Sequence, residues 1–329
     1  MIAYPVRTED YHTGGEPFRI VASPPVTIDG ATVAERRMFA IGDAAVDGLR
    51  RVLCHEPRGH ADMYGGFIVP PDDPGAQFGV LFWHKDGFST ACGHGTIALG
   101  AWAVRTGRVP APDDGVTDVV IDVPSGRVTA RVHTTGGRVT AVDFVSVPSF
   151  LVSASVTVPT SRGPVSVAVS YGGALYAQVP AADVGLAVRS SDLVSLIALG
   201  REIKAGLADH PAARHPADDR LSGIYGVIFH EQVDGPLHQR NVTIFADGQV
   251  DRSPCGSGTA ARVATLAATG ALAPGDTLLH ESIVGSRFVA CYSGTSEVLP
   301  VITGMAHPTG THEFVIDPDD PMTPGFVLR

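Results

Sequence analysis

The sequence predicts a mixed α/β protein made of two similar halves, and three observations lead to this prediction. Most of the 329 residues fall in short valine-rich segments separated by glycine, proline and aspartate turns, a pattern typical of half-buried strands. Only three segments have the apolar spacing of helices, near residues 93–106, 184–207 and 256–269. The motifs that open the first and third of these helices repeat each other about half a chain apart.

The strand predictions rest on alternation of apolar and polar residues, which places every second side chain on one face of a sheet. The clearest examples are residues 119–123, 138–145, 165–169 and 240–245. A domain boundary is expected near residues 146–155, where a new segment follows the end of a strand pair. Residues 209–219, which are rich in alanine, proline, histidine and aspartate, are expected to form a surface loop.

The repeat is a five-residue motif of the form Cys-Gly-x-Gly-Thr. It occurs as residues 92–96 and again as residues 255–259. The identity resumes where each helix is expected to stop, at Thr-Gly pairs whose glycine suits the position after a helix end. Two matching starts with two matching ends indicate a duplicated domain rather than coincidence.

Composition and charge exclude several classes of protein. Charged residues make up 18% of the chain and the net charge is −10, so no basic surface for nucleic acid is expected. No apolar run reaches the roughly 20 residues that span a bilayer, and no signal pattern opens the chain, so the cytoplasm is expected. The four scattered cysteines are expected to be free thiols, with Cys54 and Cys291 as ordinary buried or half-buried residues.

The repeated motif predicts chemistry at Cys92 and Cys255. Glycines let the backbone turn tightly into a helix whose first amides are unsatisfied donors, which suits a carboxylate ligand. The same positive end of the helix is expected to lower the pKa of a cysteine thiol from about 8.5 toward neutrality, the range of a general acid or base. Two such thiols suggest an acid/base pair that acts on opposite faces of one carbon atom.

Several stretches of the chain closely resemble the proline racemase family, and the resemblance spans the sequence. They are His12-Thr13-Gly14-Gly15-Glu16-Pro17, residues 56–65, Cys92-Gly93-His94-Gly95, Asp251-Arg252-Ser253-Pro254-Cys255-Gly256-Ser257-Gly258-Thr259, and the end of the chain from Thr309 to Pro321. The resemblance implies an α/β (α+β) fold like that of diaminopimelate epimerase. Two pseudo-symmetric domains would each wrap a sheet around a central helix, with the site in the cleft between them.

The same resemblance implies the domain limits and the partners. The first domain would comprise residues 1–148 with 305–329 and carry Cys92, and the second would comprise residues 149–304 and carry Cys255. The resemblance also implies a homodimer, a proline or hydroxyproline substrate, and neither pyridoxal phosphate nor a metal as cofactor.

Site residues carried over by motif fall into three groups. Cys92 and Cys255 would be the acid/base pair. Asp251 would meet the ring amine of the substrate. The remaining residues would bind the carboxylate or flank the ring: Gly93, His94, Gly256 and Ser257 for the carboxylate, and Tyr64 and Phe245 for the ring. His12 and Glu16 are expected to serve turns and packing.

The substrate and the outcome stay open at this point. The Cys/Cys pair favours a racemase or 2-epimerase, and Tyr64 places 4-hydroxyproline slightly ahead of proline. The sequence around Tyr64 and Phe245 instead resembles that of trans-3-hydroxy-L-proline dehydratases. A non-catalytic amino-acid-binding protein and a pyridoxal enzyme, which would need Lys85 or Lys204, are weaker alternatives. No histidine spacing of a zinc site is present, and the glycines near residue 93 lack the acidic partner of a dinucleotide site.

Overall fold

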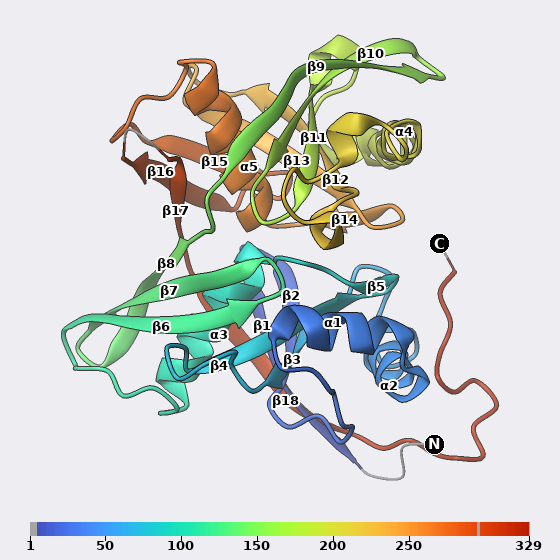
Figure 1. Ribbon diagram of the computed structural model, residues 1–329, viewed down its shortest axis with the longest axis vertical. Helices are drawn as coiled ribbons and strands as arrows, with labels where there is room; N and C mark the ends of the chain where they lie inside the picture. Colours follow the sequence, from blue (N-terminus) through green and yellow to red (C-terminus); the bar gives the residue numbers. More distant parts are fainter. Residues whose placement is uncertain (1–4, 295–296, 329) are drawn as a thin grey trace. The chain divides into compact units, whose positions relative to one another are not determined.

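The computed structural model describes residues 5–294 and 297–328 and divides into two compact units. Unit 1 comprises the described residues of 1–142 and 305–329, and unit 2 comprises those of 143–304. Each unit is a curved sheet with helices (Figure 1). Strand β8 (Arg138–Val145) runs from the first unit into the second.

Unit 1 holds a mixed sheet in which β18, β1 and β2 are antiparallel neighbours. Strand β2 then pairs in parallel with β3, β3 antiparallel with β4, β4 in parallel with β6, and β6 antiparallel with β7. The short β5 pairs with the end of β4. The strands are β1 (Val6–Thr13), β2 (Glu16–Val21), β3 (Tyr64–Val69), β4 (Phe78–His84), β5 (Gly87–Phe88), β6 (Gly115–Val123), β7 (Gly126–Thr135) and β18 (Ala306–Phe314).

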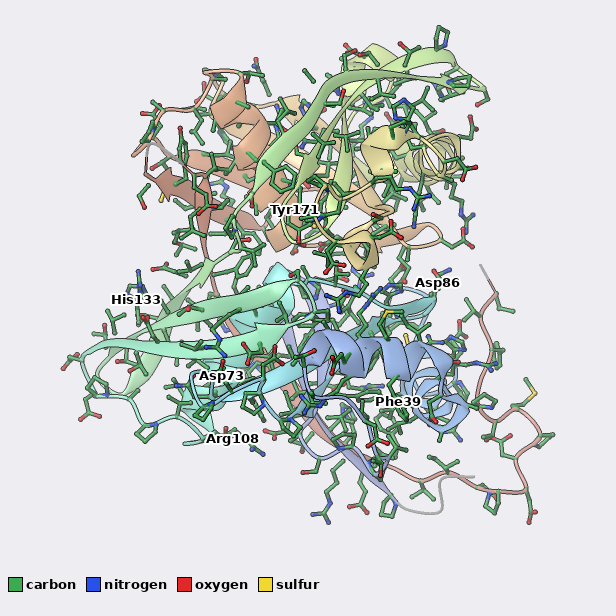
Figure 2. All side chains as sticks on the ribbon, in the orientation of Figure 1. Phe39, Asp73, Asp86, Arg108, His133 and Tyr171 are labelled. Atoms are coloured by element: carbon green, nitrogen blue, oxygen red, sulfur yellow. The ribbon has the colours of Figure 1, made fainter. Side chains whose placement is uncertain are left out.

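Helix α3 (Gly93–Arg105) lies inside the curve of this sheet, because it contacts strands from both of its ends: β18 and β1 on one side, β6 and β7 on the other. Every residue from Gly93 to Ala103 is buried, as expected of a helix that is apolar all round. Past the end of the helix lies Arg108, which is labelled in Figure 2. Its guanidinium is 4.5 Å from the ring centre of Trp102. The prediction of a helix near residues 93–106 is confirmed.

Two further helices of unit 1, α1 (Val33–Gly42) and α2 (Ala44–Cys54), contradict the prediction of only three helical segments. Their signals are local: the Thr32 hydroxyl accepts from the Glu35 amide, the Glu35 carboxylate accepts from the Thr32 amide, and Asp43 caps α2. This reciprocal Thr-x-x-Glu arrangement is a helix-start signature. The strand-like composition of the whole chain masked it.

Unit 2 repeats the pairing pattern of unit 1. Strands β9 and β10 are antiparallel, as are β10 and β11; β11 and β12 are parallel; β12 and β13 are antiparallel; β13 and β15 are parallel; β15, β16 and β17 are antiparallel. The short β14 pairs with the end of β13, as β5 does with β4. The strands are β9 (Phe150–Thr160), β10 (Gly163–Tyr171), β11 (Leu175–Pro180), β12 (Ile224–Gln232), β13 (His238–Phe245), β14 (Gln249–Asp251), β15 (Leu278–Ser282), β16 (Arg287–Ser293) and β17 (Leu299–Gly304).

Helix α5 (Gly256–Ala268) occupies the place in unit 2 that α3 has in unit 1, contacting β9 and β10 as well as β16 and β17. The predicted helix near residues 256–269 is therefore confirmed. The helix predicted for residues 184–207 begins later than expected, as α4 (Leu193–Gly206). The start of the predicted range instead holds the end of the 3₁₀ turn η1 (Ala181–Val184), which stops at Gly185 with a left-handed backbone. Three more 3₁₀ turns complete the unit: η2 (Ser190–Asp192), η3 (Pro211–Ala213) and η4 (Asp219–Leu221).

The described residues contain no helix that is both long enough and apolar enough to cross a membrane. The central helices and the strands around them supply most of the buried apolar side chains, and the largest of these include Trp83, Trp102, Phe144 and Phe229.

Candidate active site

Cys92 is the N-cap residue of α3. Its Sγ atom accepts a hydrogen bond from the Gly95 amide at 3.2 Å and lies 3.4 Å from Nδ1 of His94. The backbone of Cys92 is extended, with φ of −156° and ψ of 103°. A thiol in this place lies at the positive end of a buried helix with an imidazole at hydrogen-bond distance, so a proton can pass between the two groups.

His94 is held between aromatic rings. Its ring meets the rings of Tyr64 and Phe18 edge to face, with centroids 5.0 and 5.8 Å away. Tyr64 is the first residue of β3, and its hydroxyl lies 2.5 Å from Oγ of Ser89. Tyr64, His94 and Cys92 thus form one cluster in unit 1, which brings together three residues singled out in the sequence.

The β1–β2 hairpin fixes the first turn of α3 from outside the helix. Thr13 donates its hydroxyl to the carbonyl of His94 at 2.9 Å. Gly14 and Gly15 have φ of 59° and 95°, values that favour glycine, and the amide of Gly15 donates to Nδ1 of His12. The structure thus gives His12 a turn contact and places the hairpin against the helix start.

Cys255 precedes α5 in unit 2 with a backbone conformation unlike that of Cys92. Its φ is 63° and its ψ is 101°. In the described part of the chain, only Cys255 and Ala246 have a positive φ without being glycine. Such a conformation costs of order 1–3 kcal/mol for a residue with a side chain and is concentrated at functional sites. The strain therefore marks Cys255 as a candidate for function independently of the sequence motif.

Asp251 ends β14 and is connected to Cys255 through Ser253. Its Oδ1 accepts from both the amide and the hydroxyl of Ser253, at 2.8 and 2.7 Å, and Oγ of Ser253 accepts from the Cys255 amide at 3.0 Å. Burial raises the pKa of Asp251 to about 6, although its hydrogen bonds act in the opposite direction. At neutral pH the group is a buried carboxylate beside the thiol, suited to a cationic amine.

Tyr176 is a residue of this cluster that sequence reasoning missed. Its hydroxyl lies 2.7 Å from Oγ of Ser257 and 3.9 Å from Sγ of Cys255. Its ring meets that of Tyr225, which in turn stacks on Phe245. The only sequence signal for a role of Tyr176 was its place in an apolar strand, because a buried tyrosine hydroxyl needs a hydrogen-bond partner. Which residue is that partner depends on the tertiary structure.

The expectation of a lowered thiol pKa is wrong for Cys255. Burial raises its pKa well above the usual value, and the neighbouring Asp251 carboxylate raises it further, while the Thr243 hydroxyl and the Gly258 amide lower it less. Desolvation disfavours the thiolate more than the helix end favours it. Cys255 is consequently a thiol at neutral pH, the form that donates a proton.

Gly95 and Gly258 leave the space that the two sulfur atoms occupy. A Cβ atom on either glycine would lie 2.8 Å from the Sγ atom of the cysteine three residues before it. The first helical turn of each unit therefore requires glycine at this position, because the thiol sits over the helix end. This requirement explains the second glycine of the repeated motif.

We expect Gly95→Ala and Gly258→Ala each to lower turnover about 10²-fold, because the added methyl group displaces the sulfur atom from its place and, at Gly95, also meets the Phe18 ring at 2.5 Å. Gly48→Ala is the matched control: it lies within a helix, no heavy atom lies within 4 Å of its would-be Cβ, and it should keep turnover and add about 0.5–1 kcal/mol of stability. Steady-state kinetics and thermal melting check both effects. Equal turnover in Gly258→Ala and Gly48→Ala would contradict the role of the glycine.

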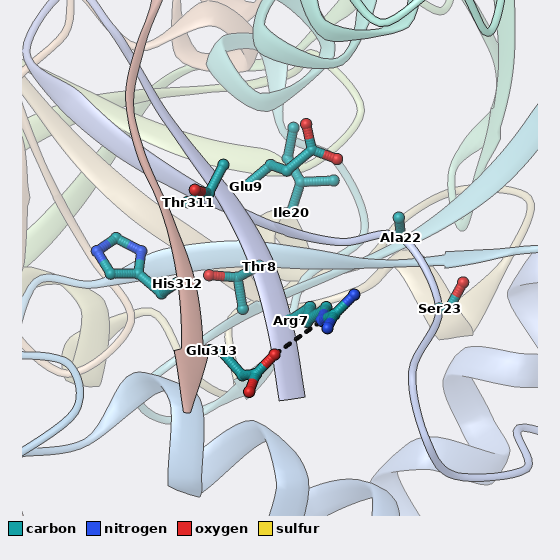
Figure 3. A pocket seen from close by; sticks show the side chains of 9 residues that line it. All are labelled: Arg7, Thr8, Glu9, Ile20, Ala22, Ser23, Thr311, His312 and Glu313. Atoms are coloured by element: carbon teal, nitrogen blue, oxygen red, sulfur yellow. Dashed lines mark hydrogen bonds and ion pairs between the residues drawn. The ribbon is translucent and has the colours of Figure 1, made fainter. Parts of the chain in front are cut away.

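Unit 1 also has a hollow of about 520 Å³, which lies away from the Cys92 cluster. It is lined by residues of β1, β18 and the end of β2, among them Arg7, which forms an exposed ion pair with Glu313 (Figure 3). None of its lining residues belongs to the Cys92 cluster. Among the described residues, no group of three or more His, Cys, Asp or Glu side chains is arranged to hold a metal ion.

Comparisons with known proteins identify the family. Residues 9–327 match the family model described as proline racemase. The chain belongs to the proline racemase family. Two similar members are a trans-3-hydroxy-L-proline dehydratase from Bacillus thuringiensis, 42% identical with 98% of this chain and 97% of the relative covered, and a 3-hydroxyproline 2-epimerase from Burkholderia multivorans, 43% identical with coverage of 100% and 99%.

Solved structures of proline racemase family members have the same fold. A hydroxyproline epimerase from Agrobacterium vitis with bound trans-4-hydroxy-L-proline gives a TM-score of 0.92 at 29% identity, covering 99% of this chain and 96% of that one. A probable proline racemase from Agrobacterium radiobacter also gives 0.92, at 30% identity, with 98% and 96% covered. The predicted α+β fold of the proline racemase family is confirmed.

Proposed function

We propose that Cys92 and Cys255 are the acid/base pair of a reaction at the α-carbon of a hydroxyproline, carried out by the chain's own side chains. The observation that carries this proposal is the repeat itself: each unit places one thiol at the start of its buried central helix, over a glycine that makes room for it. The backbone amides at the start of each central helix would supply donors for a substrate carboxylate, and they would stabilise the charge that develops when the α-proton leaves.

The two thiols have different neighbours, which supports different roles. Cys92 lies beside the imidazole of His94, a group able to take its proton, so Cys92 is the base in our proposal. Cys255 has a raised pKa and lies beside the Asp251 carboxylate, so it is the proton donor. Asp251 would also hold the ring amine, as expected from the sequence.

We place trans-3-hydroxy-L-proline first among substrates. Several relatives at 42–43% identity are named for 3-hydroxyproline, as dehydratases or as a 2-epimerase. The expectation of 4-hydroxyproline rested on the Tyr64 hydroxyl as a contact for the ring hydroxyl, but Ser89 already engages that hydroxyl. This contact weakens the reason for preferring 4-hydroxyproline.

Dehydration is the outcome that we place first, because six relatives at 40–43% identity carry the dehydratase name. Cys92 would take the α-proton, and the C3–O bond would break as the hydroxyl, which lies on the same ring face as that proton, leaves as water with the proton that Cys92 has taken. The resulting enamine would tautomerise to a pyrroline-2-carboxylate as Cys255 protonates C3 from the opposite face and the ring nitrogen loses its proton. The second candidate is 2-epimerisation, the outcome that the sequence favoured. Here the Cys255 thiol returns a proton to the opposite face of the same carbon, which the presence of two thiols supports.

A substrate panel in deuterium oxide tests the proposal. Purified protein is incubated with trans-3-hydroxy-L-proline, trans-4-hydroxy-L-proline and L-proline, and each sample is followed by proton NMR, polarimetry and imine trapping with o-aminobenzaldehyde. We expect a trapped imine from the 3-hydroxy compound alone. Deuterium at the α-carbon of a 2-epimer, without imine, would establish the second candidate; no reaction and no exchange with any of the three would overturn the proposal.

A further inference from the structure

The backbone of Cys255 is held in its left-handed conformation by contacts to the residue before it. The carbonyl of Pro254 accepts two hydrogen bonds, from Nδ2 of Asn241 and from Oγ1 of Thr259, each at 3.1 Å. Asn241 lies on β13 and also donates to the carbonyl of Glu281 on β15. The carbonyl that precedes the strained residue is therefore anchored both to the sheet and to α5.

A third residue continues this chain of hydrogen bonds. Nδ1 of His280, on β15, lies 2.8 Å from Oγ1 of Thr259. Because the Thr259 hydroxyl donates to Pro254, it accepts from His280, so Nδ1 of the imidazole carries a proton. Burial, aided by the Arg262 charge, lowers the pKa of His280 to about 3, so the imidazole is in its neutral form. The side chains of Asn241, Thr259 and His280 are all fully buried.

Unit 1 shows what the same motif does without this arrangement. Thr96, the counterpart of Thr259, donates to the carbonyl of Cys92 itself at 2.8 Å, an ordinary bond within the first helical turn. Cys92 then keeps an extended backbone, with φ of −156°. In unit 1 the threonine hydroxyl of the motif donates to the carbonyl of the cysteine, whereas in unit 2 it donates to the carbonyl of the residue before the cysteine. This difference coincides with the positive φ of Cys255.

We propose that Asn241, Thr259 and His280 are positioning residues for Cys255, which hold the Pro254 carbonyl so that the thiol is directed toward Asp251 and Tyr176. The expected effect on turnover rests on the proposed function, whereas the expected effect on the Cys255 backbone does not. Loss of the Thr259 hydroxyl frees the Pro254 carbonyl from α5, and the turn then relaxes toward the negative φ that a residue with a side chain prefers.

A thermal melting cycle tests the structural part without any substrate. Glycine tolerates positive φ and alanine does not, so in the parent chain Cys255→Gly is expected to melt about 2 °C above Cys255→Ala. In a Thr259→Val background this advantage of glycine should vanish. Thr96→Val, the same substitution at the counterpart position, should preserve it. An equal glycine advantage in all three backgrounds would overturn the proposal.

Kinetics test the catalytic part. Thr259→Val is expected to lower kcat at least about tenfold with KM changed less than about twofold, and Thr259→Ser, which restores the hydroxyl, should return kcat to within about threefold of the parent value. A kcat loss that serine does not restore would identify a packing effect and overturn the positioning role. If the glycine advantage depends on Thr259 as expected but the protein turns over no hydroxyproline, the structural role would be retained and the proposed function rejected.

Discussion

Replacing Cys92 or Cys255 by serine is expected to lower turnover of trans-3-hydroxy-L-proline about 10²–10⁴-fold, the usual contribution of a general acid or base. A serine hydroxyl fits the space but does not ionise in the range where a thiol does, so it neither takes nor supplies the proton at a useful rate. Single-turnover kinetics in deuterium oxide measure the loss of substrate together with the entry of deuterium, at C3 of the imine product or at the α-carbon of a 2-epimer.

Cys291→Ser is the control for the cysteine substitutions. This half-buried thiol lies on β16, outside both clusters, and its replacement should leave turnover within about twofold of the parent value. Full activity in Cys92→Ser or in Cys255→Ser would show that one thiol is enough and would remove the basis for an acid/base pair.

Asp251→Asn is expected to have the second large effect, a loss of about 10–100-fold in kcat/KM through loss of the charged partner of the ring amine. Asparagine keeps an oxygen that accepts from Ser253, so the turn before Cys255 is preserved. Because the pKa of Asp251 is about 6, the kcat/KM of the parent should rise as pH increases through about 6, and this limb should disappear in the variant. Removal of the negative charge should also lower the pKa of Cys255.

The raised pKa of Asp251 has a stability consequence with a definite sign. The folded protein binds more protons than the unfolded chain between about pH 4, the unfolded value, and about pH 6, the folded value. The free energy of unfolding therefore falls in this window as pH rises, and the contribution of Asp251 to this fall should be absent in Asp251→Asn. Urea denaturation at pH 4 and at pH 7 measures it; identical pH dependence in both proteins would contradict a raised pKa.

The repeated motif predicted the positions of Cys92 and Cys255 at helix starts because glycine, threonine and helix ends leave local signals. The two central helices followed for the same reason. Helices α1 and α2 were not predicted, although Thr32, Glu35 and Asp43 are recognisable caps, because the composition of the chain as a whole favours strands.

Other features of the site depend on contacts that no sequence pattern encodes. Tyr176 reaches Ser257 and Cys255 only because β11 and α5 pack together, and Asn241 and His280 reach the Cys255 turn across the sheet. The pKa of Cys255 was predicted with the wrong sign, because the motif reveals the helix end but not the depth of burial, and burial is the larger effect.

The central claim is that both thiols act on one bound substrate molecule, and a short bifunctional alkylating reagent tests it most directly. Treatment with 1,3-dibromoacetone, followed by protease digestion and mass spectrometry, should join the peptide that carries Cys92 to the peptide that carries Cys255 within a single chain. Pyrrole-2-carboxylate, a planar analogue of the substrate, should protect both. Separate single adducts on the two peptides, with no joined product, would contradict the claim.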